Sequence, residues 1–281
     1  MTKNVDLKKN LFIILIIIIL LFYVIFSSYI KYNPDRWLHL YGNTDAIDKI
    51  SNFSFWWYSL TGQMFGSFVY IFPILLSTIA VSSFFKVYHT GYFQNIIQRI
   101  GYKKTIKYEI IKCWIYSLIL PIISLITLGV SKVLYKNSII SKYNEVEGYP
   151  FQLVNSQMEN MNPYLFIFYH MIITVLFSLI IINIAIIFTR YLKKSYLVTI
   201  ASYVTIIALE NFNNLILAPI VARLSGIDKM FNGFSLYNLY YLDAIPSLQW
   251  EFLFAIILLI VSLIIIYIVY RKRESVCINY E

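Results

Sequence analysis

Charged residues are scarce in this sequence of 281 residues: Asp, Glu, Lys and Arg make up only 13% of it, against about a quarter in soluble domains. Hydrophobic residues reach 59%, and the mean hydropathy is +0.69. Such a composition excludes an ordinary soluble domain. What the chain does contain is a series of apolar runs of about twenty residues, the length that an α-helix needs to cross a bilayer. The sequence therefore indicates an all-α multi-pass membrane protein.

Motifs for catalysis and nucleotide binding are also missing. The phosphate-binding pattern GxxxxGK[ST] does not occur, so we expect no cofactor in this chain and place any ATP and Mg²⁺ in a partner chain. Neither HExxH nor GxSxG occurs. The two cysteines, Cys113 and Cys277, and the three histidines lack metal-ligand spacing. We predict no catalytic, cofactor-binding or metal site here and interpret both cysteines as ordinary thiols.

Six apolar runs have spanning length, and we treat residues 1–281 as one transmembrane domain. The runs lie at about 11–30, 65–85, 111–130, 164–189, 196–220 and 252–270. The first is longer than the core of a signal peptide and no A-x-A-like site follows it, so it is interpreted as a retained helix. Pro73 and Pro121 lie inside the second and third runs and predict kinks there. The aromatic pair Trp56 and Trp57 precedes the second run and is interpreted as an anchor at the membrane interface.

The fifth run is interrupted by polar residues. Tyr196–Leu209 would form about 21 Å of helix, which is shorter than a hydrocarbon core of about 30 Å. Glu210 and three nearby asparagines must then enter or approach the membrane before residues 215–220 complete the crossing. We therefore predict that this span is broken towards its outer end.

An acid inside an apolar run costs about 2.5–3.5 kcal/mol on the insertion scale, so Glu210 is a candidate functional residue. His170 lies at a comparable depth in the fourth run, and we hypothesise that it shares an intramembrane polar cluster with Glu210, Asn211 and Asn214. The alternative is that Glu210 is protonated, is hydrogen-bonded between helices, or reaches the outer interface.

Basic residues are distributed unevenly between the two sides. Fifteen of the 23 lysines and arginines lie in the N-terminus, the segment 86–112, the turn 190–194 and the tail after 270. The positive-inside rule then places both termini in the cytoplasm. The net charge of +9 is explained by this topology and by attraction to membrane lipids, without a nucleic acid as partner.

A short amphipathic helix is predicted within the basic segment, over residues 92–100. Its apolar residues recur at i, i+3, i+4 and i+7 and share one face: Phe93, Ile96, Ile97 and Ile100. Polar residues take the other face: Gln94, Asn95, Gln98 and Arg99. The helix is too short to cross a bilayer. Its apolar face either lies on lipid or docks on a partner protein.

This layout resembles that of ABC-2 type transporter permeases, the membrane subunits of exporters whose ATPase is a separate chain. The residues that carry the resemblance lie between the second and third spans: Gly91, Ile96, Ile97, Arg99, Gly101, Lys103, Lys104 and Lys112. The sequence departs from the family at the acidic residue that often precedes the glycine, because Tyr88, His89 and Thr90 stand there.

The resemblance implies that the 92–100 helix is a coupling helix that seats in a groove of the ATPase. Its contact residues would be Tyr92, Phe93, Ile96, Ile97, Arg99 and Ile100. It also implies short re-entrant outer helices within 215–241, two ATPase copies, and a second permease that is identical or related. The expected location is a bacterial plasma membrane, and the expected cargo is an amphiphilic peptide such as a bacteriocin, an antibiotic, or a lipid-like molecule.

Two other functions stay open. One is an intramembrane transferase that acts on a lipid-linked substrate, with His39 or Glu210 in a catalytic role. The other is a stand-alone immunity or sensor protein that needs no ATPase.

Overall fold

The computed structural model describes residues 2–31, 52–61, 63–89, 92–134, 163–212, 215–216, 219–220, 223 and 248–271. In this part of the chain, six helices are long and apolar enough to cross a membrane. The chain is therefore a multi-pass membrane protein, and the predicted all-α fold with six spans is confirmed. Cys277 and His39 lie outside the described residues.

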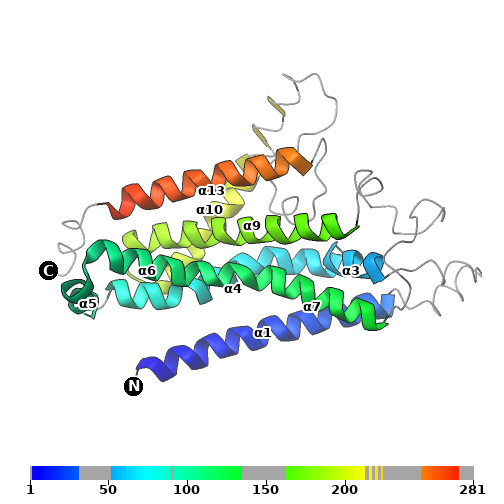
Figure 1. Cartoon of the computed structure of the whole chain (residues 1–281), viewed down its shortest axis with the longest axis horizontal. Helices are drawn as coiled ribbons and strands as arrows, with labels where there is room; N and C mark the ends of the chain where they lie inside the picture. Colours follow the sequence, from blue (N-terminus) through cyan, green and yellow to red (C-terminus); the bar gives the residue numbers. More distant parts are fainter. Residues whose placement is uncertain are drawn as a thin grey trace, which may run out of the picture.

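The helices of the described residues carry the labels of Figure 1. The spans are α1 (Thr2–Lys31), α4 (Gln63–His89), the composite third span, α9 (Pro163–Tyr191), α10 (Ser195–Phe212) and α13 (Leu248–Tyr270). The third span consists of α6 (Tyr102–Ile115), a 3₁₀ turn η2 (Tyr116–Leu118) and α7 (Ile119–Leu134). Two shorter helices are also described: α3 (Asn52–Thr61) and α5 (Tyr92–Ile100).

The third span begins nine residues earlier than the sequence predicted, at Tyr102 instead of about residue 111. The reason is a helical stripe of buried residues on α6 that continues into the apolar run: Tyr102, Thr105, Ile106, Glu109, Ile110 and Cys113. Lysines that suggested a surface segment occupy the exposed face of the same helix. The span has 33 residues, about 50 Å of helix, and is longer than a hydrocarbon core of about 30 Å.

Pro121 affects the third span one turn before its own position. Proline has no N–H to donate to the carbonyl four residues earlier, here that of Ser117. The helix tightens into the 3₁₀ turn η2 at that place. The helix α4, in contrast, is continuous through Pro73.

The helix of the fifth span ends close to the predicted break. The helix α10 has 18 residues and ends at Phe212, two residues after Glu210. That residues 215–220 complete the crossing stays a prediction. The re-entrant helices expected within 215–241 lie mostly outside the described residues. That part of the prediction stays a prediction.

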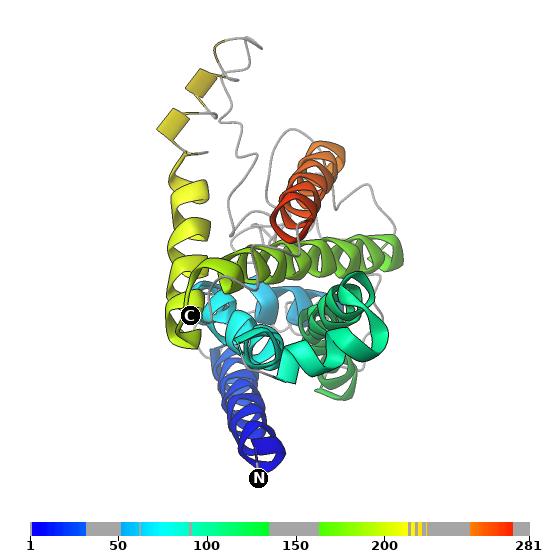
Figure 2. The same ribbon diagram turned by 90° about the vertical axis from the view of Figure 1, so that its left-hand side faces the viewer.

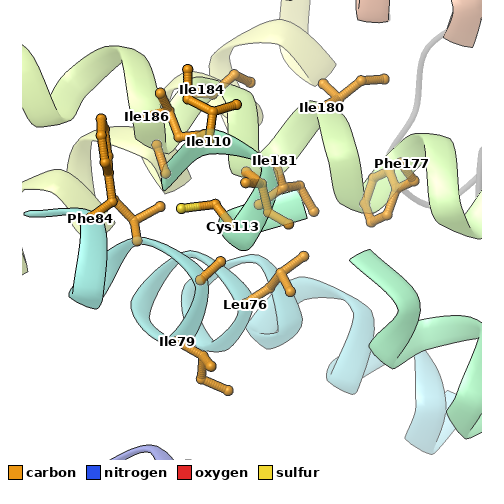
Figure 3. Packing of buried hydrophobic residues seen from close by; sticks show 14 of the residues in the cluster. Leu76, Ile79, Phe84, Ile110, Cys113, Phe177, Ile180, Ile181, Ile184 and Ile186 are labelled. Carbon is orange, nitrogen blue, oxygen red and sulfur yellow. The ribbon is translucent and has the colours of Figure 1, made fainter. Parts of the chain in front are cut away.

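The helix α9 lies at the centre of the bundle, in contact with α4, α7, α10 and α13 (Figures 1 and 2). Small and hydroxyl-bearing side chains on α9 are fully buried, among them Thr174, Ser178 and Ala185. Such residues allow neighbouring helices to approach closely where hydrophobic burial provides little driving force. Figure 3 shows α4, α6 and α9 meeting around Cys113, which is also fully buried.

One end of the bundle collects the basic elements. The N-terminal end of α1, the helix α5 and the C-terminal end of α13 lie together there (Figure 1). The turn at 192–194 belongs to the same end, because Thr189 at the end of α9 contacts His89 at the end of α4. We refer to it as the basic end.

Gly101 connects α5 to α6 with a backbone conformation that requires glycine. Its φ of 85° and ψ of 150° fall in a region that is essentially restricted to glycine. We expect Gly101→Ala to lower the stability of this junction by about 1–3 kcal/mol, measured as a lower melting temperature of the purified chain in detergent.

Gly129→Ala is the matched control for Gly101→Ala. A Cβ at either glycine meets no atom within 4 Å, but Gly129 has no positive φ and lies within α7. Alanine there should be neutral or stabilising, since alanine is favoured over glycine in helices by about 1 kcal/mol. Equal melting temperatures for the two variants would contradict the assignment of strain to Gly101.

Candidate functional site

Hydrogen bonds on both sides of Gly101 fix the junction between α5 and α6. The amide of Gly101 donates to the Ile97 carbonyl at 2.8 Å, which closes the last turn of α5. The Gly101 carbonyl then accepts from the amide of Thr105 at 3.1 Å and from its hydroxyl at 2.9 Å, which begins α6. The two helices therefore share one glycine with no flexible linker between them.

The apolar face of α5 packs against its own chain. Phe93 is only 1% exposed and Ile97 is 9% exposed, whereas Ile96 is half-buried. Ile100 at the end of the helix is 48% exposed. Of the contact residues expected for a partner, Phe93 and Ile97 are thus occupied within the chain, and the side chain of Tyr92 is outside the described part of the structure.

Aromatic side chains hold α5 to the bundle. Tyr88 lies at the centre of this group, with its ring centroid 5.3 Å from that of Phe93 and 5.7 Å from that of Tyr270. Phe84 contacts both tyrosines at 5.8 Å, and Tyr102 meets Phe93 edge-on at 6.3 Å. Edge-on and tilted arrangements at these separations are favourable for aromatic rings. We name these five residues the aromatic cluster; it joins α4, α5, α6 and α13.

Two hydrogen bonds connect the same region to α9. The Tyr270 hydroxyl donates to the Ile186 carbonyl at 2.8 Å. The Nε2 atom of His89 lies 2.7 Å from the Thr189 carbonyl; because a carbonyl can only accept, Nε2 carries the proton. The ends of α4, α9 and α13 are therefore bonded to one another beside α5.

The outward face of α5 is polar and exposed. It consists of Gln94, Asn95, Gln98 and Arg99, with Ile100 at its edge. The sequence correctly separated the two faces, but it left open where the apolar one lies. The structure puts that face on the bundle, so the polar face and Ile100 form the exposed surface of α5.

His170 lies in a second buried region, away from the basic end. Its Nδ1 is 3.3 Å from the Ser124 hydroxyl of α7, and its ring meets the Trp56 ring edge-on at 5.5 Å. The Trp56 indole N–H donates to the Ser124 carbonyl at 3.0 Å. Trp56 is fully buried, so its interpretation as an anchor at the lipid interface is wrong. An indole whose N–H finds a buried carbonyl packs as well inside a protein as at an interface.

The other residues of the predicted polar cluster lie on α10 or beyond it. Glu210 is buried near the end of α10, whereas Asn211 is exposed and its amide donates to the Ile207 carbonyl of its own helix at 3.0 Å. Asn214 is outside the described residues. The α10 helix crosses α9 near the 192–194 turn, and its far end points away from the N-terminal half of α9 that carries His170 (Figure 2). A cluster of all four residues stays a prediction.

A third polar group was not found from the sequence. Asn183 of α9 accepts from the Trp114 indole at 2.9 Å and donates to the Ser262 hydroxyl at 2.9 Å. It thereby joins α6, α9 and α13 within the apolar bundle. An asparagine inside a run as apolar as 164–189 is the signal that could have identified it, since polar side chains there must find a partner on another helix.

We expect Phe93→Ala to release α5 from the bundle. Replacing a buried phenylalanine costs about 3–5 kcal/mol, and here the loss falls on one short helix. Amide hydrogens of residues 93–100 should then exchange much faster, while those of α9 keep their protection. Ile100→Ala, at an exposed position of the same helix, should leave the exchange unchanged. Equal exchange in the two variants would contradict the role of the aromatic cluster.

Comparisons with known protein families, with curated proteins and with solved structures found no match for this chain. What bears on function is the arrangement itself: six apolar helices, a short helix held at the basic end, and buried polar groups between helices. Among the described residues, no three His, Cys, Asp or Glu side chains gather as a metal site.

Proposed function

We propose that the chain is the permease subunit of an ATP-driven exporter of the ABC-2 type, with both termini in the cytoplasm of a bacterium. The observation that carries this proposal is the placement of α5. A nine-residue helix is anchored by its apolar side chains to the ends of the spans and turns its polar side outward. Lipid anchoring alone would favour the opposite orientation, with Phe93 and Ile97 facing the acyl chains.

In this mechanism α5 seats in a groove of a separate ATPase chain, which binds ATP and Mg²⁺. When two such ATPases close on ATP, they push α5 towards the spans, and Phe93 presses on the other rings of the aromatic cluster. Tyr88 and Tyr270 pass the displacement to α4 and α13, and the bond from Tyr270 to Ile186 passes it to α9. Because α9 contacts most of the other spans, a shift at its end reorients the bundle.

The cargo in this proposal is amphiphilic: a peptide, an antibiotic or a lipid-like molecule. The spans are apolar along most of their exposed surface, with Phe22, Leu125 and Ile264 as examples, which suits a molecule that partitions into the bilayer. A second permease, identical or related, completes the pathway between the two halves.

The test is copurification with an ATPase chain that carries the GxxxxGK[ST] motif, sought in the reading frames next to the one that encodes this chain. In the double variant Arg99→Glu, Ile100→Asp, the exposed face of α5 is altered while Phe93 and Ile97 remain in place. We expect retention of the ATPase to fall about thirtyfold, because central contacts of an interface contribute about 2 kcal/mol or more.

Two controls make this result specific to α5. Lys193→Glu introduces the same charge change as Arg99→Glu, at an exposed position of the basic end away from α5, and should leave retention unchanged. Ile100→Val keeps the apolar edge and should do the same. If a folded double variant retains the ATPase as well as the native chain does, α5 is not the coupling element.

A further inference from the structure

The basic end contains a groove between α6 and α13, and it shares only Tyr102 and Tyr270 with the aromatic cluster. It has a volume of about 630 Å³, within the range of about 300–1,000 Å³ that is usual for small-molecule sites. Its lining on α6 extends from Tyr102 to Trp114, and its lining on α13 extends from Leu263 to Arg271. We name it the α6–α13 groove.

Three cations line the groove near the helix ends. Lys103 and Lys107 lie one turn apart on α6, and Arg271 follows the last residue of α13. All three are exposed, and none forms an ion pair with another residue in the part of the chain that the structure describes. Cations from both sides therefore line one groove, and no acidic side chain among the described residues pairs with them.

The rest of the lining is apolar. Ile106, Ile110 and Ile111 contribute from α6, and Leu263 and Ile266 contribute from α13. Trp114 forms the deep end, where its indole N–H is already bonded to Asn183. The groove thus offers positive charge at one end and hydrocarbon contacts along its length.

The length of the groove matches one leaflet of a bilayer. From Lys103 to Trp114 there are eleven helical steps, or about 16 Å at 1.5 Å per residue, close to half of a hydrocarbon core of about 30 Å. The exposed Tyr267 lies beside the cations, and tyrosine favours the depth of the headgroups.

We propose that the α6–α13 groove is a binding site for one anionic phospholipid of the inner leaflet. Its phosphate lies between Lys103, Lys107 and Arg271, where the guanidinium can bind two phosphate oxygens at once. An acyl chain follows the isoleucine side chains towards Trp114.

Other occupants fit the groove less well. A free phosphate would contact the cations and leave the apolar lining unoccupied. A second copy of the protein, docked on this groove by two-fold symmetry, would bring two sets of cations together, and their repulsion would oppose the contact. The site does not depend on the presence of an ATPase.

The test uses the full-length chain, purified in detergent, stripped of lipid and examined by native mass spectrometry. It is titrated with phosphatidylglycerol, phosphatidylcholine or inorganic phosphate. We expect one phosphatidylglycerol to be retained, phosphatidylcholine to be lost readily, and millimolar phosphate to leave the bound lipid in place. Displacement of the lipid by phosphate, or equal retention of both lipids, would overturn the proposal.

A charge variant and a matched control separate this site from general attraction. The triple variant Lys103→Ala, Lys107→Ala, Arg271→Ala should bind phosphatidylglycerol about a hundredfold more weakly, at about fivefold for each cation. The control Lys104→Ala, Lys193→Ala, Lys194→Ala removes three exposed cations of the same end that do not line the groove. Equal losses of affinity in the two variants would show that the lipid is attracted by the positive charge of the whole end, and would overturn the proposal.

Single variants make the same comparison if the triple groove variant does not fold. Arg271→Gln should bind phosphatidylglycerol about fivefold more weakly than Lys193→Gln.

A filled groove tests the place of the acyl chain. Ile111→Trp adds an indole to the lining without changing any charge, and we expect it to weaken phosphatidylglycerol binding at least tenfold. Unchanged binding would contradict the proposed position of the acyl chain. A native chain that forms a dimer and binds no lipid until the dimer dissociates would assign the groove to a second copy.

Discussion

Close packing around α9 is the interaction on which the rest of the structure depends. A bilayer supplies no water to unpaired polar groups, so helices inside it must satisfy them within or between themselves. Fully buried Thr174, Ser178 and Ala185 bring neighbouring helices close to α9, and Asn183 bonds to two of them directly. The peripheral helix α1, in contrast, exposes most of its apolar side chains, as a lipid-facing span does.

The two ends of the bundle are built differently. At the basic end, the aromatic cluster joins four helices, and the hydrogen bond from Tyr270 to Ile186 connects it to α9. Towards the other end, Trp56 of α3 and His170 of α9 both contact Ser124 of α7. A rigid junction between α5 and the spans suits a surface that transmits force. The α6–α13 groove beside this junction places a proposed lipid where it can contact the same helices.

Sequence patterns predicted the spans because long apolar runs have few alternatives, and they predicted α5 because its period distinguishes two faces. The start of α6 was misplaced, since lysines on one face concealed the buried stripe that includes Ile106 and Ile110. Trp56 was misinterpreted because aromatic residues at a polar border suit both an interface and a core. The contact between His170 and Ser124 depends on which spans are neighbours, and one sequence carries no information on that. Tyr88 and Tyr270 do not stand out in the sequence, because the chain contains 25 tyrosines.

The central claim is that the exposed face of α5 lies on the cytoplasmic side, where an ATPase can reach it. Gln98 is exposed on that face, and Cys113 is buried, so a Gln98→Cys variant with Cys277→Ser offers one reactive thiol. A membrane-impermeant maleimide should label it in inverted membrane vesicles and leave it unlabelled in intact cells. Labelling of intact cells from outside would contradict the account.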